Sequence, residues 1–444
     1  MKEEQKKKYI VAVEFGSSRI SMAAGYHDEK DNRFVVDAIE TVESGGCVKR
    51  GRVINVADAE YKVSSLKKRL ENRISPYKIT QVYVGVGGQS IRSVEHRLVY
   101  PISSDIAIDE TLLQEMAQEV GKRVLGNNLT VFDVVMGECR VDDRVTANPC
   151  GEYGSEIQVS YRLIVGNERH KRNLEKVFSN LKFSVAGYIV TAVATAKAAV
   201  SAEERRQGLA ILDCGAETTT LSIFRDGYLS YLVTIPLGGK NITRDICDLH
   251  ITENEAEELK RVYEPRRSEG LSLPEAWQQQ GYILDIKPET LEEVIVARLG
   301  EIIANVTHQI DESRQKQFLN GGMTLVGGAA LLKGLREQLK RETALDVIIG
   351  TVVDVSMPRG RGAGTIYAPI VGLLLSGDKE CATCEVAQPQ KQDTPQEGKS
   401  QIVSETQSVT ETQSVPKDKS QRNPRAGIST LFEIAKGWVN DEDN

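Results

Sequence analysis

The chain has 444 residues, of which 40% are hydrophobic and 27% charged, and it carries a net charge of −7 at pH 7. This length allows two or more domains with a sizeable core, and the composition is that of a soluble globular protein. The acidic balance gives no general electrostatic footprint for binding nucleic acid. Seven scattered cysteines, an odd number, imply no disulfide framework and fit a reducing cytoplasm.

The amino-terminal segment MKEEQKKK is charged and lacks the apolar core of a signal peptide. No stretch of the chain reaches the ~18 apolar residues that a transmembrane helix needs. We therefore expect any membrane contact to be peripheral.

The first part of the chain predicts strands followed by a helix. Residues 9–44 read as three strands, with a polar turn at 28–32 between the second and the third. A helix is predicted over 55–75, because Val63, Leu66, Leu70 and Ile74 share one face and Pro76 follows its end.

Residues 82–165 form a distinct block that reads as a strand, a helix and two more strands. The block lies between the helix at 55–75 and another predicted helix at 168–181. This arrangement is typical of a small α/β unit inserted into a larger domain. A short helix at 190–200 then connects to the second half of the chain.

The second half begins with a turn that favours phosphate binding. Over 209–237 the chain reads as a strand, a turn of small residues, a Thr-rich strand and a third strand, with Asp213 ending the first strand. Clustered backbone N–H groups in such a turn form an anion-binding concavity, and an Asp at the strand end suits Mg²⁺ held through water. The alternative is an ordinary hairpin turn.

A matching turn occurs in the first half. Glu14-x-Gly16-Ser17 aligns with Asp213-x-Gly215-Ala216, and both follow an apolar strand. A duplicated turn of this kind indicates two related half-domains that face one another.

Beyond this turn the sequence is mainly helical. Helices are predicted at 241–250, 253–263 and 290–317, followed by a strand, a Gly-Gly turn and a helix from 323, and by a buried helix at 366–375. The turn contains Gly327, Gly328 and Ala329. Glycines there allow a planar base or a ribose to approach the backbone closely.

A change of composition marks residues 377–427. The segment from 376 to 427 contains no Leu, Phe, Tyr or Trp and carries ETQSV twice, so it cannot bury enough apolar surface to fold. We predict a disordered linker that includes Cys381 and Cys384. One CxxC pair cannot complete a four-ligand zinc site.

Hydrophobic residues return in an amphipathic pattern over 428–444. Thr430 and Glu433 form a capping box that starts a helix. A helix this short needs a surface to lie on, either a membrane interface or a groove on a partner. The long linker disfavours docking on the chain's own core. The predicted membrane-facing residues are Ile428, Leu431, Phe432, Ile434, Ala435, Trp438 and Val439.

Two phosphate turns followed by a Gly-Gly turn are the layout of the actin-like ATPase superfamily, and within it the chain most resembles the FtsA family of bacterial division proteins. The similarity covers residues 9 to about 376 and includes QVYVGVGGQSIRSVEHRLVYPIS in the inserted block and LGGKNITRDI at 237–246. It implies an α/β, two-lobed actin-like (Hsp70/actin ATPase) fold with an inserted small α/β subdomain, a disordered linker and a C-terminal amphipathic helix. The implied domains are a first lobe in two parts (9–81 and 166–205), the insertion (82–165), a second lobe (206–355, helical at about 241–310), a closing helix (356–376), the linker (377–427) and the terminal helix (428–444).

The resemblance also implies a function. A protein of this family would bind ATP and Mg²⁺, polymerise, hold the FtsZ ring to the cytoplasmic face of the membrane at the division site, and recruit later division proteins. The alternative is an ATP-dependent enzyme of the same superfamily, either a small-molecule kinase or a chaperone-type ATPase. A chaperone would need a substrate domain after residue 376, and a kinase would need a catalytic carboxylate in an acceptor pocket; the sequence indicates neither.

Site residues are transferred by position. The first phosphate turn corresponds to Gly16, Ser17 and Ser18, the second to Asp213, Gly215, Ala216, Glu217 and Thr218, and the adenosine turn to Gly327, Gly328 and Ala329. Glu257 and Lys260 match the superfamily's base and ribose contacts, although their spacing equally fits a solvated ion pair. Glu14 and Asp213 are the candidate Mg²⁺ ligands.

Three departures from the superfamily pattern favour ATP binding over rapid hydrolysis. Glu14 replaces the usual Asp, which moves the carboxylate outward by one methylene. Ala216-Glu217 replaces a common Gly-Gly, which adds a negative side chain that could serve the metal, position water or repel the phosphates. The helix at 190–200 offers only Thr191 and Thr195 to orient water, and general-base help is worth roughly 10²–10⁴ in rate. We therefore expect weak or negligible ATPase activity.

Overall fold

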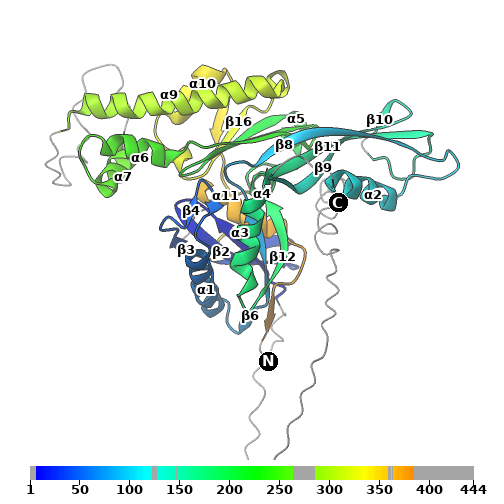
Figure 1. The fold of residues 1–444 in the computed structure, drawn as a ribbon, viewed down its shortest axis with the longest axis horizontal. Helices are drawn as coiled ribbons and strands as arrows, with labels where there is room; N and C mark the ends of the chain where they lie inside the picture. Colours follow the sequence, from blue (N-terminus) through cyan, green and yellow to red (C-terminus); the bar gives the residue numbers. More distant parts are fainter. Residues whose placement is uncertain are drawn as a thin grey trace, which may run out of the picture.

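The computed structural model describes residues 7–122, 128–146, 148–263, 286–358, 362 and 364–384. Two sheets organise this part of the chain, and each belongs to a different lobe. Figure 1 shows the two lobes as a long upper body above a smaller lower lobe.

The first, lower lobe is built on a six-stranded sheet of order β12-β7-β1-β2-β3-β18. Three helices pack on this sheet or on each other: α1 (Val56–Arg73) lies against β2 and β3, α11 (Ala368–Leu375) lies against β1, and α4 (Thr191–Ala199) packs on α11. The remaining helix is α3 (Glu168–Ser179), beside α1. The strands are β1 (Ile10–Phe15), β2 (Arg19–Asp28), β3 (Arg33–Glu43), β7 (Gln81–Val86), β12 (Ser184–Val190) and β18 (Val355–Ser356).

The helix predicted over 55–75 is confirmed as α1. Asn55 caps its first turn by accepting a hydrogen bond from the backbone N–H of Asp58. Val63, Leu66 and Leu70 lie on the buried face of α1, as their spacing predicted. The three strands predicted at the amino terminus are likewise confirmed as β1, β2 and β3.

The upper body is built on a nine-stranded sheet of order β10-β9-β11-β8-β15-β14-β13-β16-β17. The strands nearest the site are β13 (Leu209–Cys214), β14 (Thr219–Arg225), β15 (Tyr228–Ile235), β16 (Met323–Val326) and β17 (Val347–Ile349). The helices of this second lobe are α5 (Ala202–Gln207), α6 (Gly239–Cys247), α7 (Glu253–Val262), α9 (Pro288–Ser313) and α10 (Leu335–Thr343). Short 3₁₀ turns are η1 (Lys316–Phe318), η2 (Ala329–Leu331) and η3 (Thr365–Tyr367).

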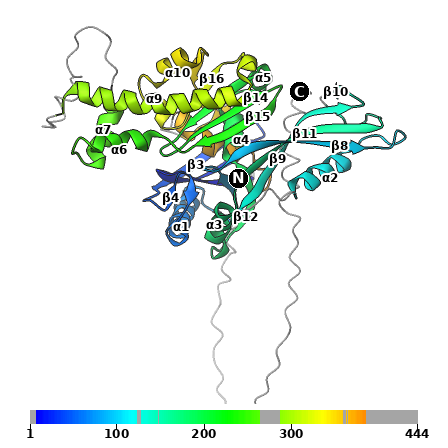
Figure 2. The same ribbon diagram turned by 45° about the horizontal axis from the view of Figure 1, so that its top comes forward.

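The inserted block shares this sheet but has its own core. Its elements are β8 (Arg92–Pro101), α2 (Glu110–Gly121), β9 (Leu129–Val141), β10 (Arg144–Thr146) and β11 (Glu156–Asn167). A separate cluster of buried side chains, including Met116, Val159 and Tyr161, lies between α2 and the strands. The strand β8 meets β15 at Arg92 and Val233, so the insertion extends the second lobe's sheet; Figure 2 shows the resulting projection.

Two predicted boundaries are wrong. Residues 82–86 belong to β7, which pairs with β1 and β12 in the first lobe, so the insertion begins after this strand. Residues 377–384 are folded rather than part of a linker, since β19 (Ala382–Cys384) pairs with β6 (Tyr77–Ile79) and Cys381 is fully buried. The rest of the predicted linker and the terminal helix lie outside the described residues.

Other boundaries differ by less. The long helix predicted at 290–317 is α9, which ends at Ser313 and is followed by η1. The Gly-Gly turn leads into η2, and α10 starts only at Leu335. In the part of the chain that the structure describes, no helix has both the length and the apolar character to cross a membrane.

Candidate functional site

The two predicted phosphate turns have the same backbone geometry. The N–H of Gly16 donates to the carbonyl of Arg19 at 2.9 Å, and the N–H of Gly215 donates to the carbonyl of Thr218 at 2.8 Å. Each turn joins the first and second strands of its lobe, β1 to β2 and β13 to β14. Within the described residues, the N–H groups at the tips, such as those of Ser17 and Glu217, have no hydrogen-bond acceptor.

The acidic residues before these turns occupy the same register position. Glu14 lies opposite Ser21 in the first hairpin, and Asp213 lies opposite Thr220 in the second. This equivalence is stronger than the sequence match, because it fixes both carboxylates at corresponding places in two lobes.

The carboxylates of Glu14 and Asp213 are both withdrawn from water, and the charge of Asp213 acts on Glu14. The pKa of Glu14 is raised to about 7, mainly by burial; the nearby guanidinium of Arg19 lowers it, and the charge of Asp213 raises it. Burial also raises the pKa of Asp213 to about 6, again opposed by Arg19. Arg19 in turn donates to the carbonyl of Ile366, at 3.1 Å, and so connects the site to the chain entering α11.

This pair of carboxylates fits Mg²⁺, which usually takes one or two carboxylates and completes its shell with water and phosphate oxygens. Within the described ranges, no group of three or more His, Cys, Asp or Glu side chains is arranged to hold a metal ion. Glu14 and Asp213 would therefore supply a partial shell, as Mg²⁺–nucleotide sites require.

Glu217 lies in the second turn, and its carboxylate has a partner in each lobe. One carboxylate oxygen accepts the backbone N–H of Arg50 at 2.7 Å, and the other accepts from the guanidinium of Arg244 in α6, also at 2.7 Å. The residue is 7% exposed. The carboxylate is thus already satisfied by two donors.

The Gly-Gly turn lies directly against the second phosphate turn. Gly327 has a φ of +90°, and a Cβ there would lie 2.5 Å from Oδ1 of Asp213. Gly328 borders open space, where a Cβ would meet nothing within 4 Å. The structure therefore brings together the second and third predicted ligand-binding turns.

Glu257 and Lys260 belong to a half-buried network rather than to a solvated ion pair. The Lys260 ammonium donates to Glu257 at 2.5 Å, to the Thr243 hydroxyl at 2.9 Å and to the carbonyl of Gly239 at 3.2 Å. Burial lowers the pKa of Lys260. The pKa of Glu257 is also lowered: burial opposes this, but hydrogen bonds from Lys260 and Thr243 outweigh it.

Sequence reasoning missed the first turn of α6 as part of the site. The N–H of Gly239 donates to the carbonyl of Gly215, and that of Lys240 to the carbonyl of Ala216. A Cβ on Gly239 would lie 3.2 Å from the Cβ of Ala329 and 3.5 Å from the Lys260 ammonium. Gly239 is therefore where the second phosphate turn, the turn at 327–329 and α7 meet. The sequence signal for this part of the site was the pair Gly238-Gly239 at the start of a predicted helix.

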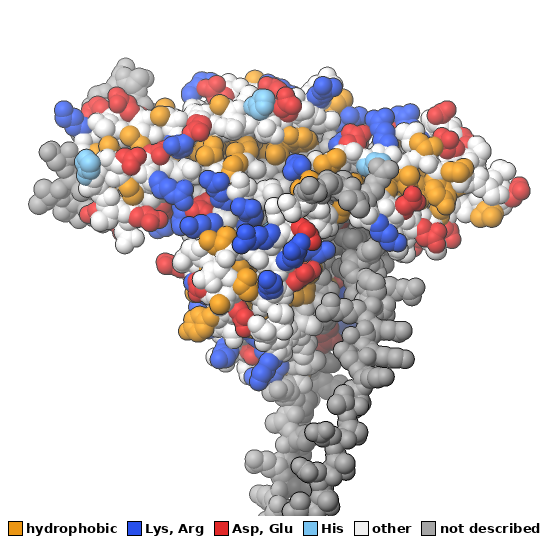
Figure 3. All heavy atoms as spheres, in the orientation of Figure 1, with side chains coloured by type: hydrophobic (Ala, Val, Ile, Leu, Met, Phe, Trp, Pro, Cys, Tyr) orange, Lys and Arg blue, Asp and Glu red, His pale blue; other side chains and the backbone are white. Residues whose placement is uncertain are grey.

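Basic side chains gather at the junction of the lobes. Figure 3 shows Lys and Arg side chains between the upper body and the lower lobe. Three basic side chains of the elements that meet there are exposed: Lys49 at the end of β4 (Val48–Lys49), Arg50 in the turn to β5 (Arg52–Val53), and Arg244 in α6. Positive charge at this junction favours an anionic ligand.

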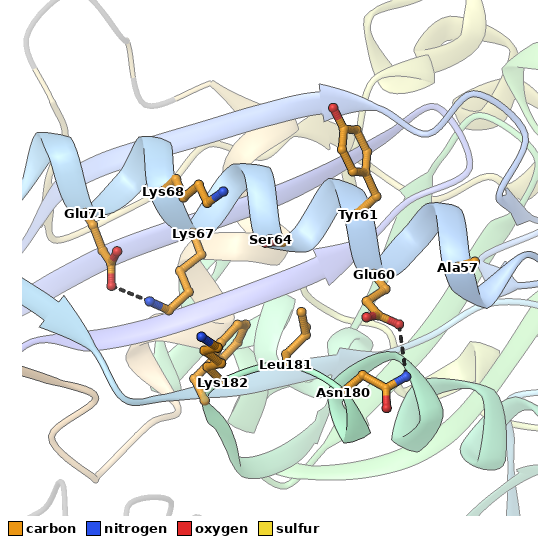
Figure 4. A pocket seen from close by; sticks show the side chains of 11 residues that line it. Ala57, Glu60, Tyr61, Ser64, Lys67, Lys68, Glu71, Asn180, Leu181 and Lys182 are labelled. Atoms are coloured by element: carbon orange, nitrogen blue, oxygen red, sulfur yellow. Dashed lines mark hydrogen bonds and ion pairs between the residues drawn. The ribbon is translucent and has the colours of Figure 1, made fainter.

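A separate hollow lies on the outer side of the first lobe. It has a volume of about 650 Å³ and lies between α1 and residues 180–183. Figure 4 shows Tyr61, Lys67 and Lys182 among its lining side chains, with Lys67 directed to Glu71. None of the predicted site residues lines it.

This two-lobed α/β architecture, with a matched turn in each lobe, is that of the actin-like class. A solved PilM–PilN type IV pilus biogenesis complex shares the fold, with a TM-score of 0.59 at 16% identity over 82% of this chain and 97% of that one. The family model described as cell division protein FtsA matches residues 210–372. The cell division protein FtsA of Porphyromonas gingivalis is 26% identical over 75% of this chain and 67% of its own length. That of Bacillus subtilis is 26% identical over 73% and 74%, and that of Neisseria meningitidis 23% identical over 84% and 90%. The chain is therefore similar to the FtsA family of cell division proteins, both in the matched region 210–372 and in its overall sequence.

Proposed function

We propose that this chain is a member of the FtsA family, and that it binds Mg²⁺–ATP between its lobes and uses it as a conformational ligand. The observation that carries this proposal is the equivalence of the two turns, each with a backbone N–H to carbonyl closure and an acid at the same register position. Paired turns from opposing lobes can hold one chain of phosphates from both sides.

Each group in the site has a role in this proposal. The N–H groups and hydroxyls of Ser17, Ser18 and Thr218, with the N–H groups of Ala216 and Glu217, hold the phosphates. Glu14 and Asp213 hold Mg²⁺ through water, and the ion neutralises phosphate charge. Gly327, Gly328 and Ala329 border the adenosine, and Glu257 and Lys260 contact the base and ribose.

Slow hydrolysis is part of the proposal, because the connecting helix α4 offers few groups that could orient a water molecule. Thr195 in α4 is 1% exposed, and its hydroxyl donates to the carbonyl of Thr191 at 2.8 Å. It is therefore committed to its own helix. Without a positioned base, the chain binds ATP and hydrolyses it slowly.

The cellular role that we propose is to polymerise and to connect FtsZ to the cytoplasmic face of the membrane at the division site. Attachment through the helix at 428–444 is supported by its amphipathic sequence. One short helix gives weak, reversible binding, and a filament would join many of them and so raise the effective affinity. The insertion, with its own core, would recruit later division proteins.

A vesicle experiment tests this role. The full chain, with ATP and Mg²⁺, is sedimented with anionic vesicles in the presence of FtsZ from the same cell. We expect the chain to carry FtsZ into the pellet. A chain lacking 428–444 should leave both proteins in solution, and pelleting that persists without this segment would contradict the proposal. Any core used for comparison should end at 384, because β19 belongs to the folded part.

A further inference from the structure

Glu217 occupies an anion-binding position that would otherwise suit a phosphate. We propose that the Glu217 carboxylate is a built-in competitor for the ligand's phosphate and so determines how tightly the site takes nucleotides. The proposal rests on the nucleotide-binding function proposed above. The proposal predicts that removal of the Glu217 charge strengthens nucleotide binding, because it frees the Arg50 N–H and the Arg244 guanidinium for the phosphate.

The two donors that bind Glu217 would also suit a phosphate. A backbone N–H and a guanidinium, both at 2.7 Å from carboxylate oxygens, are the groups that bind phosphate in many proteins. A carboxylate and a phosphate present similar oxygens to such donors. Glu217 therefore satisfies, from within the chain, the hydrogen bonds that an incoming phosphate would make.

The Glu217 carboxylate lies close to both phosphate turns. The N–H of Arg50 precedes that of Gly51, which donates to the hydroxyl of Ser17 in the first phosphate turn at 2.8 Å. Glu217 itself belongs to the second turn. Its carboxylate thus extends from one phosphate turn to the immediate neighbourhood of the other, across the space in which the phosphates are proposed to lie.

The Glu217 carboxylate is buried and depends on its two partners. The Glu217 side chain is only 8% exposed, whereas that of Arg244 is 57% exposed. A carboxylate at this depth needs its partners, because an unpaired buried charge is strongly unfavourable. A ligand phosphate must therefore displace Glu217 from Arg50 and Arg244. The apparent affinity is the intrinsic affinity multiplied by the fraction of molecules in which these donors are free.

The contact also joins the lobes in the absence of ligand. Arg50 lies between β4 and β5 of the first lobe, and Glu217 and Arg244 belong to the second. When a phosphate takes the donors, it replaces a contact within the chain by a contact through the ligand. Glu217 is in this sense a specificity-determining residue that opposes binding of anions too weak to displace it.

The test uses the full chain and calorimetric titration with Mg²⁺ and a non-hydrolysable ATP analogue. We expect Glu217→Gln to bind about tenfold more tightly than the unmodified chain. Glu40→Gln is the matched control, because Glu40 is equally buried and is paired with Arg69 and Arg73 rather than with a group of the proposed site. The affinity of this variant for the ATP analogue should be unchanged. Equal or weaker binding by Glu217→Gln would overturn the proposal.

A second variant separates competition from simple repulsion. In an Arg244→Gln background the charged one of the two contested donors is absent and only the Arg50 N–H remains, so the gain from Glu217→Gln should fall to about twofold or less. Repulsion alone would make the gain larger there, because the carboxylate would have lost its compensating charge. A larger gain therefore contradicts the proposal.

A ligand-free measurement distinguishes this proposal from the function on which it rests. Hydrogen exchange at the Arg50 amide should be slow in the unmodified chain and at least tenfold faster in Glu217→Ala, which leaves no side-chain acceptor at this position. If no variant binds the analogue, the proposed nucleotide function fails, whatever the exchange rates. If the analogue binds but exchange at Arg50 is unaffected by the substitution, the competitor role fails by itself.

Discussion

Gly327 lies so close to Asp213 that a Cβ at position 327 would be 2.5 Å from the Asp213 carboxylate oxygen. The turn proposed for adenosine and the carboxylate proposed for Mg²⁺ are therefore in direct contact. The φ of +90° at Gly327 makes a side chain unfavourable for a second, independent reason.

We predict that Gly327→Ala destabilises the second lobe by about 2–3 kcal/mol and weakens nucleotide binding at least tenfold, because both the backbone and Asp213 must move. Chemical unfolding and calorimetric titration measure the two effects. Gly328→Ala is the matched control, since Gly328 borders open space. Similar losses in both variants would contradict this assignment.

The carboxylates of Glu14 and Asp213 provide a test of the magnesium site. Asp213→Asn and Glu14→Gln should each reduce the Mg²⁺-dependent part of nucleotide affinity by roughly tenfold, because each removes one of the few charges available to the ion. Affinity is compared in Mg²⁺ and in EDTA. If either variant retains the full magnesium effect, that side chain does not serve the metal.

Asp133, on β9 of the insertion, predicts a pH dependence of stability outside the site. Burial raises its pKa to about 7, opposed by a hydrogen bond from the N–H of Val134. The unfolded chain ionises this group near pH 4, whereas the folded chain keeps the proton to near pH 7. Its stabilising contribution is therefore fully present below about pH 4, falls as pH rises from about 4 to about 7, and is absent above that.

Asp133→Asn removes this dependence. Relative to the unmodified chain, the variant should gain about 2–3 kcal/mol of stability between pH 5 and pH 8. Urea unfolding at several pH values measures the difference. A constant difference across this range would show that Asp133 is ionised in the folded protein.

The segment 377–384 offers a test of the corrected boundary. The Tyr83 hydroxyl accepts the N–H groups of Asp378 and Lys379 at 3.1 and 3.0 Å, and burial raises the pKa of the Cys381 thiol to about 11. Tyr83→Phe should cost about 1–2 kcal/mol and speed alkylation of Cys381. Tyr61→Phe, at an exposed position, should do neither. Rapid alkylation of Cys381 in the unmodified chain would place this segment outside the fold.

Much of the fold could be predicted because local pattern and structure agree. The periodicity of Val63, Leu66 and Leu70 specified α1, and the duplicated acid-x-Gly motif specified two equivalent hairpins. The residues proposed for the second phosphate turn and the Gly-Gly turn do lie together. These features depend on neighbours in the sequence or on an internal repeat.

The rest depends on long-range contacts that leave no local signal. Glu217 and the N–H of Arg50 are 167 positions apart, and nothing in either segment indicates the other. The polar composition of 377–384 suggested disorder, but pairing with β6 and burial of Cys381 outweigh it. The union of β8 with β15 was likewise invisible, because it joins segments 139 positions apart, with Arg92 facing Val233 and the N–H of Leu232 donating to the Ser93 hydroxyl.

The most direct measurement is calorimetric titration of the full chain with a non-hydrolysable ATP analogue, with and without Mg²⁺. We predict saturable binding of one nucleotide per chain that is strengthened by Mg²⁺ and weakened by Asp213→Asn. The absence of saturable binding, or binding indifferent to both Mg²⁺ and Asp213, would contradict a nucleotide site between the two lobes.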